Sequence, residues 1–149
     1  MKNLLNAHDR EDILARLQNL TPENKGLWGR LTVAQILPHM TDPLRVAIHE
    51  KSGVPQKSMV YGTFMGRMMY NWIPWPKGAP TDPGFLPGSG MTEPTTFEQD
   101  KQTLILTIHR FAHFDRPIAV SPVFGPMTHR NWGRLMWRHL DHHLTQFGV

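Results

Sequence analysis

The residues of this chain best suited to chemistry are histidines near its C-terminus. Its 149 residues contain nine histidines and no cysteine, and three of the histidines fall within the final stretch RLMWRHLDHHLTQFGV. His139 and His143 are four residues apart, and on a helix this spacing places two imidazoles side by side, one turn apart. One metal ion can bridge such a pair. The absence of cysteine excludes thiol catalysis by the protein and cysteine-ligated metal.

Helical geometry separates these three histidines. An α-helix has about 3.6 residues per turn. Around its axis, the side chains of His139, His143 and Gln146 point within about 40° of the direction of Trp132. Tryptophan is typical of a helix face that packs on a core, so the pair is expected to be buried. His142 points about 100° away from His143 and is expected on the rim.

Two buried imidazoles are costly unless their nitrogens find partners. A metal ion would supply partners, and so would hydrogen bonds to Gln146, to Asp141 or to the backbone. Spacing alone leaves these alternatives open. The zinc-protease motif does not fit, because Leu140 occupies the position where that motif has its glutamate base.

The remaining histidines are weaker candidates. His109 and His113 are also four residues apart, but they fall at the end of an expected helix, where a cationic histidine is favoured by the helix dipole. His49 has the same explanation. Nothing in the sequence singles out His8 or His129.

A metal site in a helical protein needs a third ligand from another helix, because catalytic metal sites typically take three protein ligands and keep one position open. His39 is the best candidate. Ile36, Pro43 and Val46 lie on its side of an expected helix, so His39 is expected to face inward. A core histidine with one hydrogen bond would fit the same position.

Four helical segments are expected to position these residues, as an all-α four-helix bundle within a single domain, 1–149. From their apolar periodicity and capping residues they run over Asp9 to Leu20, from Thr32 onward, from Thr95 or Thr96 to His113, and over Thr128 to Gln146. The second contains Pro38 and Pro43. It is therefore expected to be kinked, or split with Asp42 capping a new start at Pro43.

A long insertion rich in proline and glycine, residues 50–95, separates the second and third of these helices. Its part WIPWPKGAPTDPGFLPGSG cannot form a regular element. Ordered loops of this length are often functional, so the loop Trp72 to Pro87 is expected to act as a lid. A short helix is expected within MVYGTFMGRMMYNW, with four partly buried residues: Met59, Phe64, Met68 and Met69.

Composition narrows the range of partners. The net charge of +4 and pI of about 9.8 invite a nucleic-acid interpretation, but the only ordered basic set is Arg130, Arg134 and Arg138, which is typical of a solvated helix face. Nucleic-acid binding is therefore not expected. The chain has no apolar run long enough to span a bilayer, and MKNLLNAHDRED becomes charged too early for a signal peptide. We expect a cytoplasmic protein without membrane association, and the sequence leaves a homodimer open.

Together with His39, the C-terminal pair resembles the DinB-like (DinB/YfiT) superfamily of proposed metalloenzymes, and looks closest to a branch known only as a domain of unknown function. The resemblance rests on LWGRLTVAQILPHM, WPKGAPTDP and PVFGPMTHRNWGRLMWRHLDHHLTQFGV, in that order, and covers most of the chain. HLDHHLTQFG is its most specific piece. At Ser121 this chain departs from the branch, which often has histidine there.

The resemblance implies a bundle with an up-down-down-up course and a divalent metal held by three histidines, here His39, His139 and His143. Some superfamily members resemble transferases that use small thiols such as mycothiol or bacillithiol. Others, this branch among them, have no assigned activity.

Three neutral imidazoles leave the full charge on a divalent ion, which can then act as a Lewis acid in hydrolysis or thiol transfer. The ligand type suits zinc, nickel or iron without choosing among them. We therefore expect a metal-dependent enzyme acting on a small molecule, with a low-molecular-weight thiol among the candidate substrates. The alternative is a non-enzymatic bundle that binds a small molecule or a protein partner and uses the histidines structurally.

Further residues could surround such a site, although none can be assigned a catalytic role. Asp42 and Asp141 could each orient a ligand histidine, but a surface carboxylate is the simpler expectation for both. Gln146 could hydrogen-bond near the site. Lys77 and Arg138 could meet an anionic substrate.

Overall fold

The computed structural model describes residues 1–53, 58–78, 86 and 88–149, and within these ranges the chain is all-α. The described residues form five helices in this order: α1 (Ala7–Asn19), α2 (Val33–Ala47), α3 (Phe64–Asn71), α4 (Phe97–Ala112) and α5 (His129–Gln146). The four predicted long helices are thereby confirmed, and α3 is the short helix expected in the insertion. The segment AVSPVF, residues 119–124, lies in a loop that is closed by an isolated β-bridge between Ser121 and Gly125.

Side chains fix where the helices begin. Each N-cap accepts a hydrogen bond from a backbone N–H of the first turn, which satisfies a group that the helix itself leaves unpaired; the caps are Asn6, Thr32, Thr63, Thr96 and Thr128. At Thr32 the capping box with Gln35 is complete. The first helix starts at Ala7, two residues before the predicted Asp9.

Helix α2 runs unbroken through Pro38 and Pro43, so the alternative of a split helix capped by Asp42 is wrong. A proline inside a helix removes one backbone hydrogen bond and crowds the preceding turn, at a cost of about 3 kcal/mol. Burial offsets this cost, since twelve of the fifteen residues of α2 are buried. Packing against α4 and α5, rather than local preference, therefore holds α2 in its helical form.

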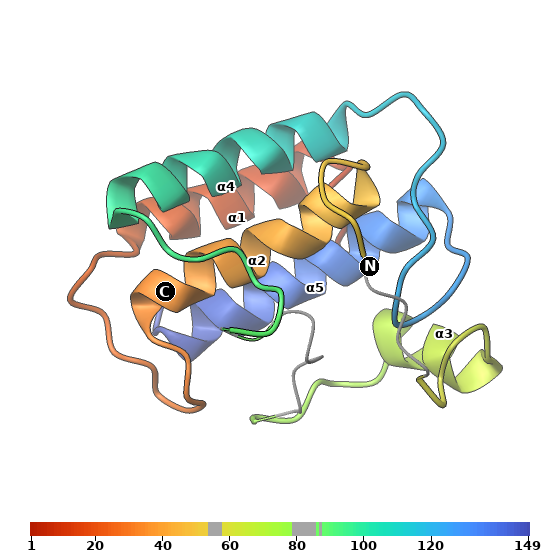
Figure 1. The fold of residues 1–149 in the computed structure, drawn as a ribbon, viewed down its shortest axis with the longest axis horizontal. Helices are drawn as coiled ribbons and strands as arrows, with labels where there is room; N and C mark the ends of the chain where they lie inside the picture. The colour runs from red at the N-terminus through yellow and green to blue at the C-terminus, as the bar shows by residue number, and fades with distance from the viewer. Residues whose placement is uncertain (54–57, 79–85, 87) are drawn as a thin grey trace.

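The four long helices lie side by side in Figure 1 and enclose one apolar core. Helix α2 packs on α4 and α5, and α1 packs on α5. Core side chains come from every long helix, and include Leu17, Met40, Ile108, Trp132 and Leu140. This packing is that of a helical bundle, with α2 and α5 adjacent where the candidate ligands lie.

The insertion is only partly as predicted. Met68 and Met69 are partly buried, but Met59 is 96% exposed and Phe64 is 74% exposed, so the prediction for these two is wrong. Helix α3 packs through Gly66 and Tyr70 instead, which turns Phe64 outward. Part of the lid expected over Trp72 to Pro87 falls on residues 79–85 and 87, outside the described residues.

None of the helices in the described part of the chain combines the length and apolar character needed to cross a bilayer.

Candidate metal centre

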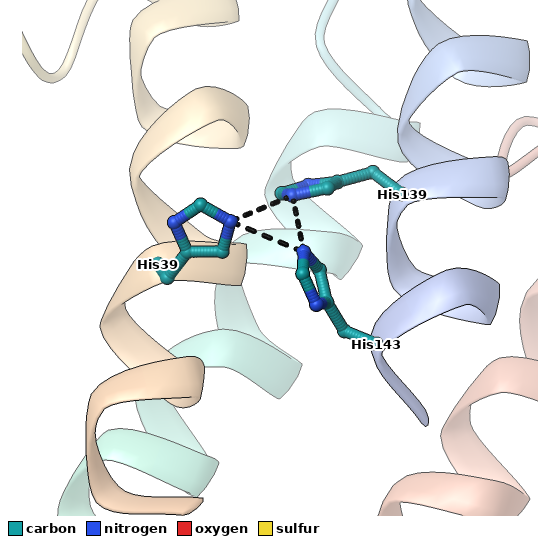
Figure 2. A group of neighbouring side chains, drawn as sticks. All are labelled: His39, His139 and His143. Atoms are coloured by element: carbon teal, nitrogen blue, oxygen red, sulfur yellow. Dashed lines mark hydrogen bonds between the residues drawn. The ribbon is translucent and has the colours of Figure 1, made fainter. Parts of the chain in front are cut away.

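Three histidines from two helices converge in the bundle core (Figure 2). His39 on α2 is 4% exposed and His139 on α5 is 7% exposed, while His143, one turn further along α5, is partly buried. The Nε2 atoms form a triangle whose three sides are each 3.1 Å. The ring planes meet edge to face, at 70° to 90° to one another. The structure thus brings together the three residues that the sequence singled out.

Hydrogen bonding alone cannot account for this triangle. In a contact between two imidazole nitrogens, one must carry the proton and the other must be bare. Among three nitrogens, at most two of the three contacts can satisfy this condition, and the third always brings together two lone pairs or two N–H groups. A cation among three bare nitrogens would satisfy all of them at once.

The spacing fits such a cation. Zinc binds histidine nitrogen at about 2.0 to 2.1 Å, so two nitrogens on one ion lie about 2.8 to 3.4 Å apart for angles between octahedral and tetrahedral. The observed 3.1 Å separations fall within this range. Among the described residues, this is the group of histidines and carboxylates that could hold a metal ion.

Gln146 determines which nitrogen of His143 carries the proton. The Gln146 side-chain nitrogen donates to the backbone carbonyl of Trp28, which can only accept. The amide oxygen of Gln146 therefore faces His143, where it lies 2.8 Å from Nδ1. Nδ1 must be the donor, so in the neutral ring Nε2 is bare and directed at the triangle.

Gly29 makes room for this arrangement. A Cβ atom at Gly29 would lie 2.3 Å from the Gln146 side-chain nitrogen, and the backbone there has a positive φ of 83°. Both conditions favour glycine over any other residue. The Trp28–Gly29 turn and the end of α5 are therefore fitted to one another around Gln146.

Burial keeps the paired imidazoles neutral. The pKa of His143 is lowered to about 3, first by burial and then by the proximity of His39, while the bond to Gln146 acts in the opposite direction. The pKa of His139 lies well below its ordinary value, first because of burial and then because of His143 and His39. Its Nδ1 is buried and has no hydrogen-bond partner among the described residues. Neutral imidazole is the form that binds a metal ion.

Aromatic side chains surround the triangle. Trp75 lies 5.9 Å from the ring of His139, and Trp28 and Trp75 each lie 6.0 Å from the ring of His142. His142 is partly buried beside His143, and burial lowers its pKa, opposed by Asp141. The sequence had assigned no role to either tryptophan, although both stand in the stretches that carry the family resemblance.

The two basic residues proposed to meet a substrate already have partners. Arg138 donates to the backbone carbonyls of Met69 and Ile73 at the end of α3, and burial lowers the pKa of its guanidinium. Lys77 lies over the ring of Trp28, 4.6 Å from its centre, and remains exposed. Lys77 is thus the better placed of the two to reach a ligand.

The two carboxylates differ in position. Asp42 is fully buried, so the predicted surface position is wrong. It accepts hydrogen bonds from the backbone N–H and the hydroxyl of Thr92 and pairs with Lys51 at 3.1 Å, which ties α2 to the segment before α4. Asp141 is at the surface as predicted and pairs with Arg16 of α1.

Three of the other histidines bond to backbone carbonyls through their side chains. His113 follows α4 and its Nδ1 bonds to the His109 carbonyl. His49 bonds to the Pro117 carbonyl and His129 to the Phe111 carbonyl. His49 thus has a specific backbone partner, and His129 has a structural contact that the sequence did not reveal.

Fold and site together define an all-α protein whose core contains three clustered histidines that could hold a metal ion. The sequence profile of the family described as "Protein of unknown function (DUF1569)" matches residues 1–148. The chain therefore belongs to this family. Comparison with curated proteins and with solved structures found no match.

Proposed function

We propose that this protein is a divalent-metal-dependent enzyme that acts on a small molecule, with His39, His139 and His143 as the metal ligands. The observation that carries the proposal is the triangle of three 3.1 Å contacts, which no distribution of protons turns into three hydrogen bonds. Zinc, nickel and iron all accept imidazole ligands. When bound, such an ion would supply Lewis-acid chemistry for hydrolysis or thiol transfer.

The protein's own residues prepare the site for this role. Gln146 orients His143 through its bond to Nδ1, and burial favours the neutral, metal-binding form of both α5 histidines. His143 is only partly buried, which supports access for a substrate from its side. The buried Nε1 of Trp28 has no acceptor among the described residues, so a substrate oxygen beside it would supply one.

A relationship to the DinB-like superfamily is part of the proposal. In its support, α1 and α5 run in one direction in Figure 1, and α2 and α4 run in the other. The ligands also come from the second and last of these four helices. Some members of that superfamily resemble small-thiol transferases, so a low-molecular-weight thiol is our first candidate for the substrate.

Metal analysis of protein purified without an affinity tag tests the metal site. We expect about one equivalent of metal in the wild type, and less than about a tenth in His39→Ala, His139→Ala and His143→Ala. The matched control is the double variant His109→Ala/His113→Ala, which removes another histidine pair of the same spacing and should retain the metal. A wild type that stays below about a tenth of an equivalent after addition of zinc, nickel or iron would refute the metal site.

Activity assays distinguish an enzyme from a structural site. The metal-loaded protein is assayed with a panel of electrophiles and several low-molecular-weight thiols, with His139→Ala as the inactive reference. Turnover that needs a thiol supports the transferase proposal, and turnover without any thiol rejects it in favour of hydrolysis. If metal removal lowers only stability, and turnover is absent throughout, the histidines are structural.

A further inference from the structure

Helix α3 and the turns on either side of it expose several large apolar side chains. The strongly exposed hydrophobic residues of the described chain cluster there: five of nine lie between residues 59 and 72, namely Met59, Tyr61, Phe64, Met65 and Trp72. Figure 1 shows α3 at the edge of the molecule, beside the start of α5, on which it packs. A cluster of this kind in a small protein marks an interaction surface.

The helical period shows that this exposure follows one face. At about 100° per residue, Phe64, Met65, Met68 and Trp72 fall within about 100° of one another. Gly66 and Tyr70, the buried residues of α3, lie on the opposite side. The helix is amphipathic, but its apolar stripe, here defined as Phe64, Met65, Met68 and Trp72, faces away from the core.

Polar contacts fix this orientation. Arg134 donates to the Asn71 side chain, and Arg138 donates to the carbonyls of Met69 and Ile73. A Cβ atom at Gly66 would lie 2.3 Å from the carbonyl oxygen of Val60, so the turn before α3 packs directly on its backbone. The inner side of α3 is therefore bound to α5 and to its own preceding turn, and the stripe cannot turn inward without breaking these contacts.

The charge of the whole chain is concentrated around the same helix. Residues 58–78 and 129–140, which include α3 and the adjoining turns of α5, contain five of the sixteen Lys and Arg residues and none of the twelve Asp and Glu residues. This region therefore carries +5, and the rest of the chain carries −1. Arg67, exposed on α3 itself, borders the stripe, and Arg130 is exposed on α5.

We propose that α3 docks the protein on the surface of anionic lipid membranes, with the apolar stripe entering the interface and the exposed Arg67 and Arg130 facing lipid headgroups. Aromatic and methionine side chains above a basic rim are what a peripheral helix presents to such a surface. A symmetric pairing of two copies through α3 would place two +5 regions against each other, which disfavours it. The sequence had predicted no membrane association because it lacks a spanning segment, and surface docking needs none.

Vesicle co-sedimentation tests the proposal on the full chain. The vesicles contain equal amounts of phosphatidylcholine and phosphatidylglycerol, and vesicles of phosphatidylcholine alone serve for comparison. We expect binding to the anionic vesicles, with affinity falling at least about tenfold when salt is raised from about 0.05 to about 0.5 M. Binding to the neutral vesicles should be weaker by a similar factor.

Two variants separate the apolar and charged contributions. Phe64→Ser/Trp72→Ser removes exposed apolar area and should weaken binding at least about tenfold, and Arg67→Glu should weaken it about tenfold. The control Leu106→Ser changes a residue that is 47% exposed on α4, and should bind as the wild type does. All four proteins should share one melting temperature, since the altered side chains are exposed.

Three outcomes would overturn the proposal. The first is no sedimentation with anionic vesicles, and the second is sedimentation that Phe64→Ser/Trp72→Ser leaves unchanged. The third is a different partner for the same face: a dimer in light scattering, or binding to a single-stranded RNA oligonucleotide, that this variant abolishes while vesicle binding is absent.

Discussion

The buried histidines should make the stability of the metal-free protein depend on pH in a defined window. In the unfolded chain each imidazole titrates near 6.5, whereas in the folded chain the pKa of His143 is about 3 and that of His139 is also far below 6.5. Below pH 6.5 the unfolded state therefore binds more protons than the folded state. Stability falls as the pH falls from about 6.5 toward 3, and is fully retained above that window.

The size of the effect follows from these values. Between pH 7 and pH 5, a histidine with a folded-state pKa of about 3 and an unfolded value of 6.5 reduces the free energy of unfolding by about 2 kcal/mol. His139, whose pKa is lowered in the same direction, should add to this loss. The loss of about 2 kcal/mol from His143 alone is a substantial part of the total stability of an ordinary domain, which is about 5 to 15 kcal/mol.

Urea denaturation at pH 7 and pH 5, in the presence of a chelator, measures this loss. The variant His143→Gln should lose about 2 kcal/mol less than the wild type between the two pH values, because one buried imidazole has been removed. The control His8→Gln retains both buried imidazoles and should keep the full wild-type loss. Equal losses in the wild type and in His143→Gln would refute the reasoning, since they would show that burial does not lower the pKa of His143.

Two further predictions concern side chains next to the ligands. Gln146→Leu should weaken zinc binding about 10- to 100-fold in isothermal titration, because the proton of His143 is no longer held on Nδ1; an unchanged affinity would show that Gln146 has no part in orienting the ligand. Asp42→Ala should lower the free energy of unfolding in urea by about 3 kcal/mol, because it leaves Lys51 and Thr92 without their buried partner. Lys51→Met should also be destabilising, because it leaves the buried Asp42 carboxylate without its cation, and an unchanged free energy of unfolding in Asp42→Ala would contradict the assignment.

The helices were predictable where their signals are local. Thr32, Thr96 and Thr128 cap the helices that the sequence placed after them, and the period of α5 placed His139 and His143 on one inward face before any contact was known. The continuation of α2 through Pro43 was not predictable, because it depends on the burial of α2 among other helices rather than on its own sequence. Proline has a low helix propensity, but at this position the packing of α2 on its neighbours outweighs it.

The surroundings of the site were predictable only in part, because they depend on contacts distant in sequence. The bond between Gln146 and the Trp28 carbonyl joins residues 118 positions apart, and no local pattern announces it. The one sequence feature that could have indicated this close contact is Gly29, a glycine directly after Trp28. The prediction for Met59 and Phe64 is wrong because apolar residues at helical spacing ordinarily face the core, and here they face outward.

The two prolines of α2 have a consequence for how the three histidines come together during folding. Leu37 and Asp42 each precede a proline, and this position disfavours helical backbone angles. Isolated α2 would therefore form little helix, whereas α5, which like α2 follows a threonine N-cap, has no internal proline. His39 therefore comes close to His139 and His143 only when α2 packs on its neighbours.

We therefore expect the triangle to assemble late on the folding pathway. An ion that needs all three nitrogens gains most of its binding energy after that docking step, so it stabilises the native state more than the transition state. Such stabilisation appears mainly as slower unfolding rather than as faster folding. The prolines beside His39 would in this way make the bound ion a determinant of the lifetime of the folded protein.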